Sequence, residues 1–141
     1  MEEYLNFAQA HPLLVFGTIG LIGLILWTEY SRVNRKYALL NVNETVRLLN
    51  NDDTVIIDVR EDKELSAGKI KGSLHIPISN FSARVNELTK HKKNDILVYC
   101  GSGNRSSHAC SIPAKEGFEN ISNLAGGLMA WKSANLPVSN K

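Results

Sequence analysis

The segment that decides the fold reads ILVYCGSGNRSS, from Ile96 to Ser107. Its first four residues form an apolar run of the kind found in buried strands. Cys100 follows directly, and Gly101 and Gly103 allow backbone conformations that other residues avoid. Successive backbone N–H groups can then point to a common centre, and the free N–H groups of a following helix add to them. The segment therefore predicts a strand, an anion-sized loop and a helix.

Cys100 is the expected nucleophile of this loop. Inward-facing N–H groups and the positive end of a helix favour the thiolate, which is the reactive form of cysteine. Arg105, at the end of the loop, either supplies a fixed positive charge or ties the loop to the domain. The alternative is a buried structural cysteine, which would need neither a glycine-rich backbone nor a helix start beside it. Because Gly101, Ser102 and Asn104 are small, we expect the pocket around Cys100 to have an open and weakly charged mouth.

On both sides of this loop, short apolar runs alternate with helical stretches. We expect further strands at residues 55–57 and 121–124, and helices at residues 43–50, with Asn43 as N-cap, 82–89 and 106–116. Continuous apolar strands that alternate with helices indicate a parallel sheet covered on both faces, which is an α/β fold. In such sheets, sites form beyond the carboxyl ends of the strands, where the loop of Cys100 lies.

The amino-terminal part of the chain has the composition of a membrane-spanning helix. Residues 4–28 contain no Asp, Glu, Lys or Arg, and residues 13–27 are apolar almost without interruption. Two glutamates, at positions 2 and 3, precede this run, whereas Arg32, Arg35 and Lys36 follow it. By the positive-inside rule, the part that follows the helix lies in the cytoplasm. A cleaved signal peptide is the alternative, but it requires a basic start and a small-residue cleavage site.

The predicted organisation is one transmembrane helix followed by one folded domain. A chain of 141 residues has room for one domain of ordinary size. The expected parts are an anchor at residues 1–28, with residues 5–28 in contact with the lipid bilayer, a linker at residues 29–37 and a domain at residues 38–141. We therefore expect a single-pass protein of the cell inner membrane with a cytoplasmic carboxyl-terminal domain.

Charge and cysteine content argue against several other classes of protein. A net charge of +2 and scattered basic residues do not indicate a nucleic-acid surface. The two cysteines, Cys100 and Cys110, form no disulfide framework, and no zinc-ligand spacing accompanies them. We expect Cys110 to be a small core residue. The alternative is a resolving thiol for Cys100, but the loop and helix between them would hold their Cα atoms beyond the ~7 Å that a disulfide allows.

The loop pattern Cys100-x-x-Gly103-x-Arg105-Ser106 resembles the active-site loop of the single-domain, thiosulfate sulfurtransferase-like rhodanese family, in its membrane-anchored bacterial type. Other segments that resemble the family are Asp58-Val59-Arg60, Glu64, Gly68, Ile70, residues 72–77, Gly117-Phe118, Asn120, Leu124, Gly126-Gly127 and Trp131. The chain departs from the family pattern at Lys69, where histidine is usual, and at Pro113, where leucine is usual. A proline at position 113 would kink or shorten the helix after the loop.

What the resemblance implies is a three-layer α/β domain with a five-stranded parallel sheet, and a sulfurtransferase activity. Cys100 would take a sulfane sulfur from thiosulfate or another persulfide donor, form a persulfide and pass the sulfur to a thiol or a sulfur-carrier protein. The implied substrate-binding residues are Gly101, Ser102, Gly103, Asn104, Arg105 and Ser106. Asp58 and Arg60 would be supporting residues that brace neighbouring turns. The resemblance implies no metal and no organic cofactor.

Two other functions compete with this interpretation. Phosphatases of the Cys-x5-Arg kind use a similar loop, but here four residues separate Cys100 from Arg105. A loop that is shorter by one residue makes a tighter pocket, better matched to a single sulfur than to a phosphate. The other alternative is a catalytically silent interaction module at the membrane. Such modules usually lack the cysteine, whereas this loop is complete.

Overall fold

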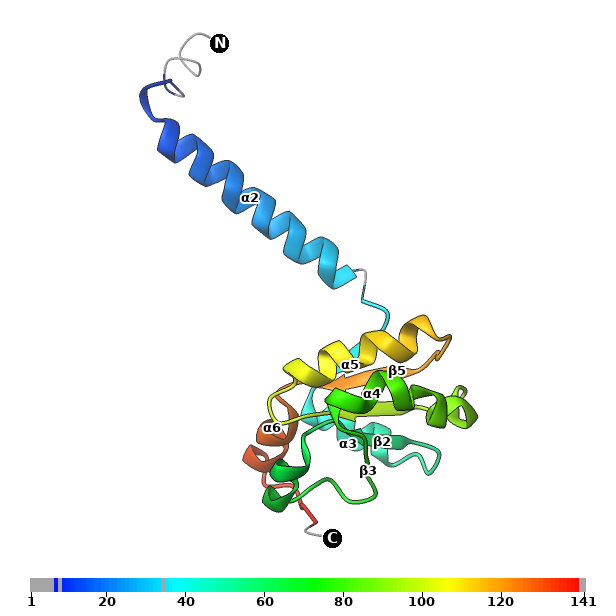
Figure 1. Ribbon diagram of the computed structural model, residues 1–141. Helices are drawn as coiled ribbons and strands as arrows, with labels where there is room; N and C mark the ends of the chain where they lie inside the picture. The colour runs from blue at the N-terminus through cyan, green and yellow to red at the C-terminus, as the bar shows by residue number, and fades with distance from the viewer. Residues whose placement is uncertain (1–6, 8, 34, 140–141) are drawn as a thin grey trace. The chain divides into compact units, whose positions relative to one another are not determined.

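The computed structural model describes residue 7, residues 9–33 and residues 35–139 (Figure 1). Contacts divide the chain into two compact units, Met1–Arg35 and Lys36–Lys141. The two early glutamates and the first residues of the predicted bilayer segment, residues 1–6 and 8, lie outside the described residues.

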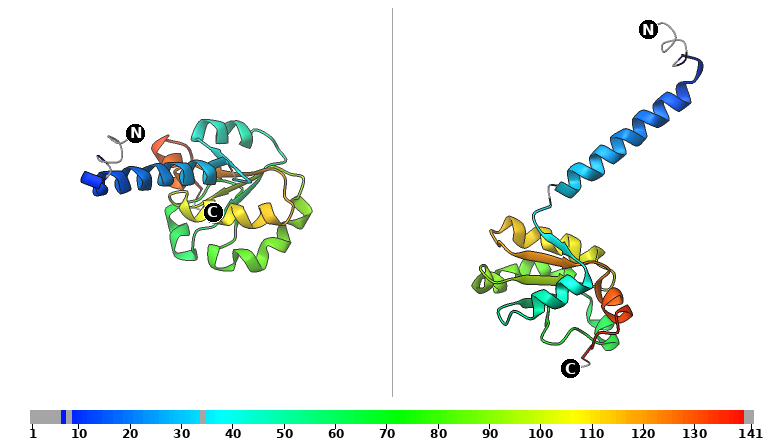
Figure 2. Two further views of the ribbon diagram at one scale, coloured as in Figure 1. Left: turned by 90° about the horizontal axis from the view of Figure 1, so that it is seen from above. Right: turned by 180° about the vertical axis from the view of Figure 1, so that it is seen from behind.

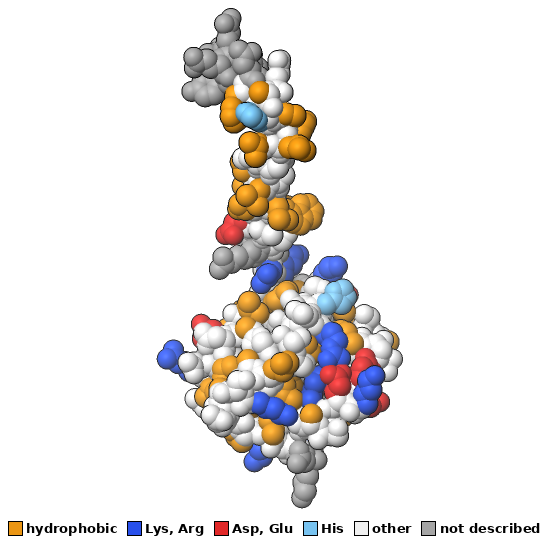
Figure 3. All heavy atoms as spheres, turned by 90° about the vertical axis from the view of Figure 1, so that its left-hand side faces the viewer, with side chains coloured by type: hydrophobic (Ala, Val, Ile, Leu, Met, Phe, Trp, Pro, Cys, Tyr) orange, Lys and Arg blue, Asp and Glu red, His pale blue; other side chains and the backbone are white. Residues whose placement is uncertain are grey.

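The first unit contains helix α2 (Pro12–Val33), whose 22 residues reach about 33 Å at ~1.5 Å per residue. This length matches the ~30 Å hydrocarbon core of a bilayer. Its stretch Pro12–Ser31 has a mean hydropathy of 1.7 and is 0% buried, and Figure 3 shows hydrophobic side chains along it. By length and composition this helix could cross a membrane, and a signal sequence has the same properties.

The first residues of the predicted linker, residues 29–33, are helical. Residues 29–33 continue α2, because they contain neither proline nor glycine and nothing in them ends the helix. The boundaries of anchor, linker and domain stay a prediction.

The second unit is built on a five-stranded sheet. Its strands are β1 (Ala38–Leu40), β2 (Val55–Asp58), β3 (Leu74–His75), β4 (Ile96–Tyr99) and β5 (Ile121–Leu124). They lie in the order β1-β5-β4-β2-β3, and every neighbouring pair is parallel. The predicted α/β fold with a five-stranded parallel sheet is therefore confirmed, and the strand that precedes Cys100 lies at its centre.

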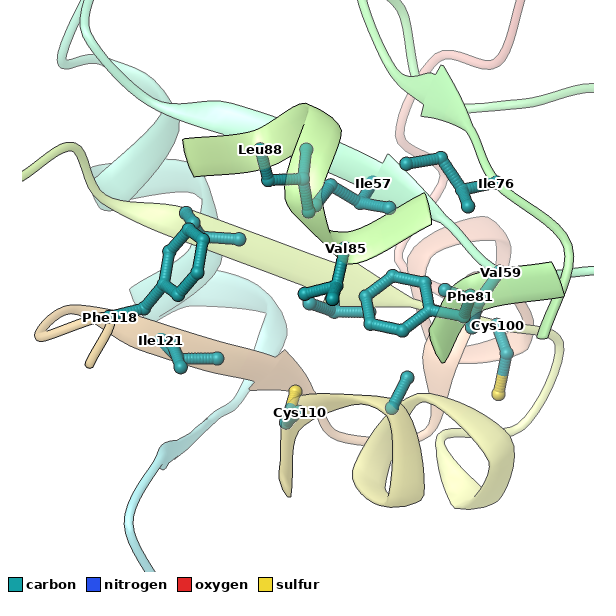
Figure 4. Close-up of a cluster of buried hydrophobic side chains, with 13 residues drawn as sticks. Ile57, Val59, Ile76, Phe81, Val85, Leu88, Cys100, Cys110, Phe118 and Ile121 are labelled. Atoms are coloured by element: carbon teal, nitrogen blue, oxygen red, sulfur yellow. The ribbon is translucent and has the colours of Figure 1, made fainter. Parts of the chain in front are cut away.

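Helices cover both faces of this sheet (Figures 1 and 2). They are α3 (Val42–Leu49), α4 (Ile78–Arg84), α5 (Asn104–Lys115) and α6 (Gly127–Ser133), with the 3-10 helices η1 (Asp62–Ala67) and η2 (Val85–His91). Side chains of β4 alternate between two cores. Val98 belongs to one core together with Phe81 of α4 and Ala109 of α5. Figure 4 shows this core, with Phe81 and Val85 among its labelled side chains. Leu97 packs in the other core, with Leu128 and Trp131 of α6. This arrangement gives three layers.

Three helical segments differ from the sequence prediction. The helix predicted at residues 82–89 is divided between α4, which begins earlier, at Ile78, and the 3-10 helix η2, which begins at Val85. The N-cap of α3 is Asn41, not Asn43, because Asn41 and Glu44 form a capping box in which each side chain accepts the other's backbone N–H. Helix α5 continues through Pro113 to Lys115, so the proline does not end the helix at its own position. The proline lies in the last turn, so the one N–H bond that it removes is followed by only two further helical residues.

Candidate active site

The loop after β4 surrounds the sulfur of Cys100 with hydrogen-bond donors. The backbone N–H of Gly103 donates to Cys100 Sγ over 3.1 Å, and the Ser106 hydroxyl lies 3.4 Å from the same atom. Gly103 has a φ of 95°, a left-handed conformation that favours glycine and turns the loop into the start of α5. The sulfur therefore lies where an anion would be stabilised.

The pKa of the Cys100 thiol is the balance of opposing effects. Burial raises this pKa, whereas the Ser106 hydroxyl and the backbone N–H groups of Ser106, Gly103 and Ser102 lower it. The hydrogen bonds outweigh burial, so the pKa lies below its ordinary value of 9.0. In contrast, burial and the nearby charge of Cys100 raise the pKa of Cys110 well above the ordinary range.

These opposite shifts predict selective alkylation. We expect iodoacetamide to modify Cys100 before Cys110, with a rate that rises with pH and has its midpoint below 9.0, because only the thiolate reacts. Peptide mass spectrometry after timed labelling at several pH values measures both sites. In denaturant, which removes both environments, the two cysteines should follow the same pH profile. A midpoint for Cys100 above 9.0 in the folded protein would contradict the assignment.

A buried asparagine of β5 holds this loop, and the sequence analysis missed it. Asn123 Nδ2 donates to the carbonyl of Gly103 over 3.1 Å, and its Oδ1 lies 2.6 Å from Ser106 Oγ. A hydroxyl has one proton, so Asn123 Oδ1, the Gly103 carbonyl at 3.2 Å and the Cys100 sulfur compete for the proton of Ser106, and the contact with Asn123 is the shortest. The available signal was a pair of polar residues, Ser122 and Asn123, between the apolar ends of the predicted strand.

Asp58 and Arg60 lie beside the loop without a hydrogen bond to the sulfur among the described residues. Arg60 Nη2 donates to Asp58 Oδ2 over 2.6 Å, and both side chains are almost fully buried. Arg60 also donates to the carbonyls of Glu64 and Gly68, over 3.1 Å and 2.8 Å. Tyr99, at the end of β4, donates to Asp58 Oδ2 over 2.8 Å. The contacts therefore support a bracing role, which fixes η1 against the sheet.

Arg105 forms a bidentate ion pair across the loop. Its Nη1 and Nη2 donate to Glu64 Oε2 and Oε1, each over 2.6 Å. A Cβ placed on Gly101 would lie 3.6 Å from Arg105 Nη2 and 3.8 Å from Glu64 Oε1, so the pair lies against the first residue of the loop. Hydrogen bonding by Arg105 lowers the pKa of Glu64 to about 2.

This ion pair corrects the predicted open and weakly charged mouth. The Cys100 residue is 0% exposed, although Ser102 and Asn104 beside it are exposed. Glu64 belongs to η1 and supplies a charge that the loop sequence alone does not contain. Figure 3 shows acidic and basic side chains gathered on one face of the domain.

A hollow of about 360 Å³ adjoins the loop at Gly101. Lys63 and Glu64 of η1 and Met129 and Lys132 of α6 also border it. The backbone N–H groups at the start of α6 fix this helix to the loop, since those of residues 128 and 129 donate to the carbonyls of residues 100 and 101 over 2.8 Å and 3.0 Å. The wall of the hollow that α6 forms is therefore fixed in position relative to Cys100.

Cys110 lies away from the loop, on α5. Figure 4 shows the sulfur of Cys110 well apart from the sulfur of Cys100, and Cys110 Sγ lies 3.7 Å from the carbonyl oxygen of Ser122. Both cysteines are free and buried. Within the described part of the chain, no group of three His, Cys, Asp or Glu side chains is placed to hold a metal ion.

Comparisons with known proteins connect this geometry to a family. The model of the rhodanese-like domain matches residues 41–134. The uncharacterized protein YibN of Escherichia coli strain K12 is 32% identical over 139 residues, which cover 98% of this chain and 97% of that protein. A sulfurtransferase of Allochromatium vinosum is 34% identical over 92 residues, which cover 65% of this chain and 84% of that protein. A rhodanese-related protein from Thermoplasma volcanium has a similar structure, with a TM-score of 0.67 and 28% identity over 74% of this chain and all of that one.

Proposed function

Since the chain belongs to the rhodanese-like domain family, we propose that it is a sulfurtransferase in which Cys100 carries the sulfur. The observation that carries the proposal is the Cys100 sulfur at the end of the central strand, which accepts the backbone N–H of Gly103 over 3.1 Å. The loop N–H groups would stabilise the Cys100 thiolate before the transfer and the negative charge on the outer sulfur of the persulfide after it. The sulfurtransferase from Allochromatium vinosum supports the same class of reaction.

The proposed reaction has two displacement steps. In the first, the Cys100 thiolate attacks the outer sulfur of thiosulfate, the sulfur–sulfur bond of the donor breaks, and sulfite leaves with the electron pair. A Cys100 persulfide anion remains, and the loop N–H groups hold its charge. In the second step, an acceptor thiolate attacks the outer sulfur of the persulfide, and the Cys100 thiolate is the leaving group. With cyanide as acceptor, the product is thiocyanate.

The proposed setting of this enzyme is the cytoplasmic side of the inner membrane. Residues 1–28 would anchor the domain formed by residues 38–141, and the acceptor would be a thiol or a sulfur-carrier protein. The support is the apolar helix α2 with basic residues after it. Protease treatment of a carboxyl-terminal tag tests the orientation, because the tag should be protected in spheroplasts and cleaved in inverted membrane vesicles.

Mass spectrometry of the membrane-bound protein tests the sulfur-transfer reaction. After incubation with thiosulfate, we expect a gain of one sulfur atom, about 32 Da, on the peptide that contains Cys100. Cyanide should remove this mass and release an equal amount of thiocyanate. Cys110→Ser serves as the control and should be loaded like the natural chain. Absence of the gain, or its appearance on Cys110 alone, would overturn the proposal.

A further inference from the structure

We propose that Glu64 occupies the position on Arg105 that an anionic sulfur donor would take, and that this carboxylate sets the donor preference of the loop. The inference rests on the proposed function and adds a specificity-determining residue to it. Glu64 would act against thiosulfate, a dianion, more strongly than against donors with less charge.

The first support is the geometry of the ion pair. Arg105 presents two N–H groups to two carboxylate oxygens, with both distances at 2.6 Å. The same planar fork can bind two oxygens of a sulfonate-like group, such as the one that thiosulfate carries beside its outer sulfur. The guanidinium also lies against the loop of the reactive cysteine, because a Cβ placed on Gly101, the residue after Cys100, would lie 3.6 Å from Arg105 Nη2. An anion bound to Arg105 would therefore lie beside the loop that holds the reactive sulfur.

The second support is that Glu64 is held in place while it is charged. Its Oε2 accepts the backbone N–H of Glu61 over 3.0 Å, in a capping box of η1, and its carbonyl accepts from Arg60. With its pKa at about 2, the Glu64 side chain is ionised at neutral pH. An anionic donor therefore meets a fixed negative charge and must displace it from Arg105.

The third support is the hollow beside Gly101, which Glu64 also borders. Arg60, Lys63 and Lys132 lie around the same space, so an anion that enters it meets three cationic side chains and one carboxylate. The lysines attract the anion into the hollow, whereas Glu64 repels it and competes with it for Arg105. The side chain of Glu64 is 30% exposed, so it can leave Arg105 without unpacking the core.

The experiment compares Glu64→Gln with Glu87→Gln in the full-length protein. Glutamine keeps the size of the side chain and can still accept the N–H of the capping box, but it carries no charge. Glu87 forms a similar two-bonded ion pair with Arg84, with distances of 2.7 Å and 2.9 Å, and is therefore a matched control. The measurement is single-turnover sulfur loading of Cys100 at several donor concentrations, followed by intact-protein mass spectrometry.

For Glu64→Gln, we expect the concentration of thiosulfate that gives half-maximal loading to fall by about threefold to fivefold, because the partly exposed ion pair that competes with the donor is lost. The maximal loading rate should change little. With benzenethiosulfonate, a monoanion, the fall should be clearly smaller. Glu64→Asp, which keeps the charge on a shorter side chain, should give an intermediate value. Glu87→Gln should match the natural chain with both donors.

Equal changes with both donors, or slower loading by Glu64→Gln, would overturn the inference, because a carboxylate that merely braces Arg105 has no reason to discriminate between donor charges. An unchanged half-maximal concentration would overturn it as well. These outcomes differ from failure of the proposed function, in which the natural chain itself takes up no sulfur. Thermal unfolding of each variant establishes that folded proteins are compared.

Discussion

Replacement of Cys100 by serine is expected to abolish sulfur loading and to lower thiocyanate formation on the order of a thousandfold or more. A serine hydroxyl is not ionised near neutral pH and forms no persulfide, so both displacement steps lose their nucleophile and leaving group. The hydroxyl is nearly the size of the thiol and can accept the N–H that Gly103 now directs to sulfur over 3.1 Å. The free energy of unfolding should therefore change by no more than about 1 kcal/mol. Mass spectrometry, a thiocyanate assay and chemical denaturation measure these three quantities.

The matched control for Cys100→Ser is Cys110→Ser. Both cysteines are buried, but Cys110 lies on α5, away from the backbone N–H groups that surround the Cys100 sulfur, and burial raises the pKa of Cys110. We expect this variant to keep its activity. Parallel assays with an aryl phosphate separate the competing functions. If the natural chain releases phosphate but forms no thiocyanate, the protein is a phosphatase. If Cys100→Ser forms as much product as the natural chain, Cys100 is not the nucleophile.

The fold could be predicted because its signals are local. Four apolar residues before Cys100 suffice to indicate a buried strand. Along the chain, apolar runs of this kind alternate with helical stretches, and this alternation indicates the parallel sheet that the structure has. Errors arose where two local signals competed. Asn41 and Asn43 are both residues of a type that forms N-caps. Asn41 is the N-cap because Glu44, three residues further on, completes its capping box.

The surroundings of the loop were harder to predict, because they come from distant parts of the chain. Glu64 lies 41 residues before Arg105, and Asn123 lies 17 residues after Ser106. Neither spacing has a local signature. Only the order of strands brings η1 and β5 to opposite sides of Cys100, and that order follows from packing of the whole sheet. The charge at the mouth of the loop is therefore a tertiary property, whereas the nucleophile is a property of the sequence.

Replacement of Gly127 by alanine is the second change with a large expected effect. Gly127 has a φ of 56°, and a Cβ there would lie 2.4 Å from the carbonyl oxygen of Cys100 and 2.8 Å from the carbonyl group of Gly101. These contacts are with backbone, so a side-chain rotation cannot relieve them. Helix α6 must move away, and the hydrogen bonds that the N–H groups of Leu128 and Met129 donate to the loop, over 2.8 Å and 3.0 Å, must lengthen.

For Gly127→Ala, we expect sulfur loading to slow on the order of a hundredfold and the free energy of unfolding to fall by about 2–4 kcal/mol, from steric overlap and backbone strain together. Gly117→Ala separates the two causes. Gly117 has a φ of 82°, but a Cβ there would meet no atom within 4 Å. That variant should lose about 1–2 kcal/mol from the left-handed backbone alone, and it should load sulfur normally. Equal loading rates in the two alanine variants would show that the reactive loop tolerates displacement of α6. Slow loading confined to Gly127→Ala would instead make the close approach of this helix to the Cys100 carbonyl part of what holds the sulfur in position.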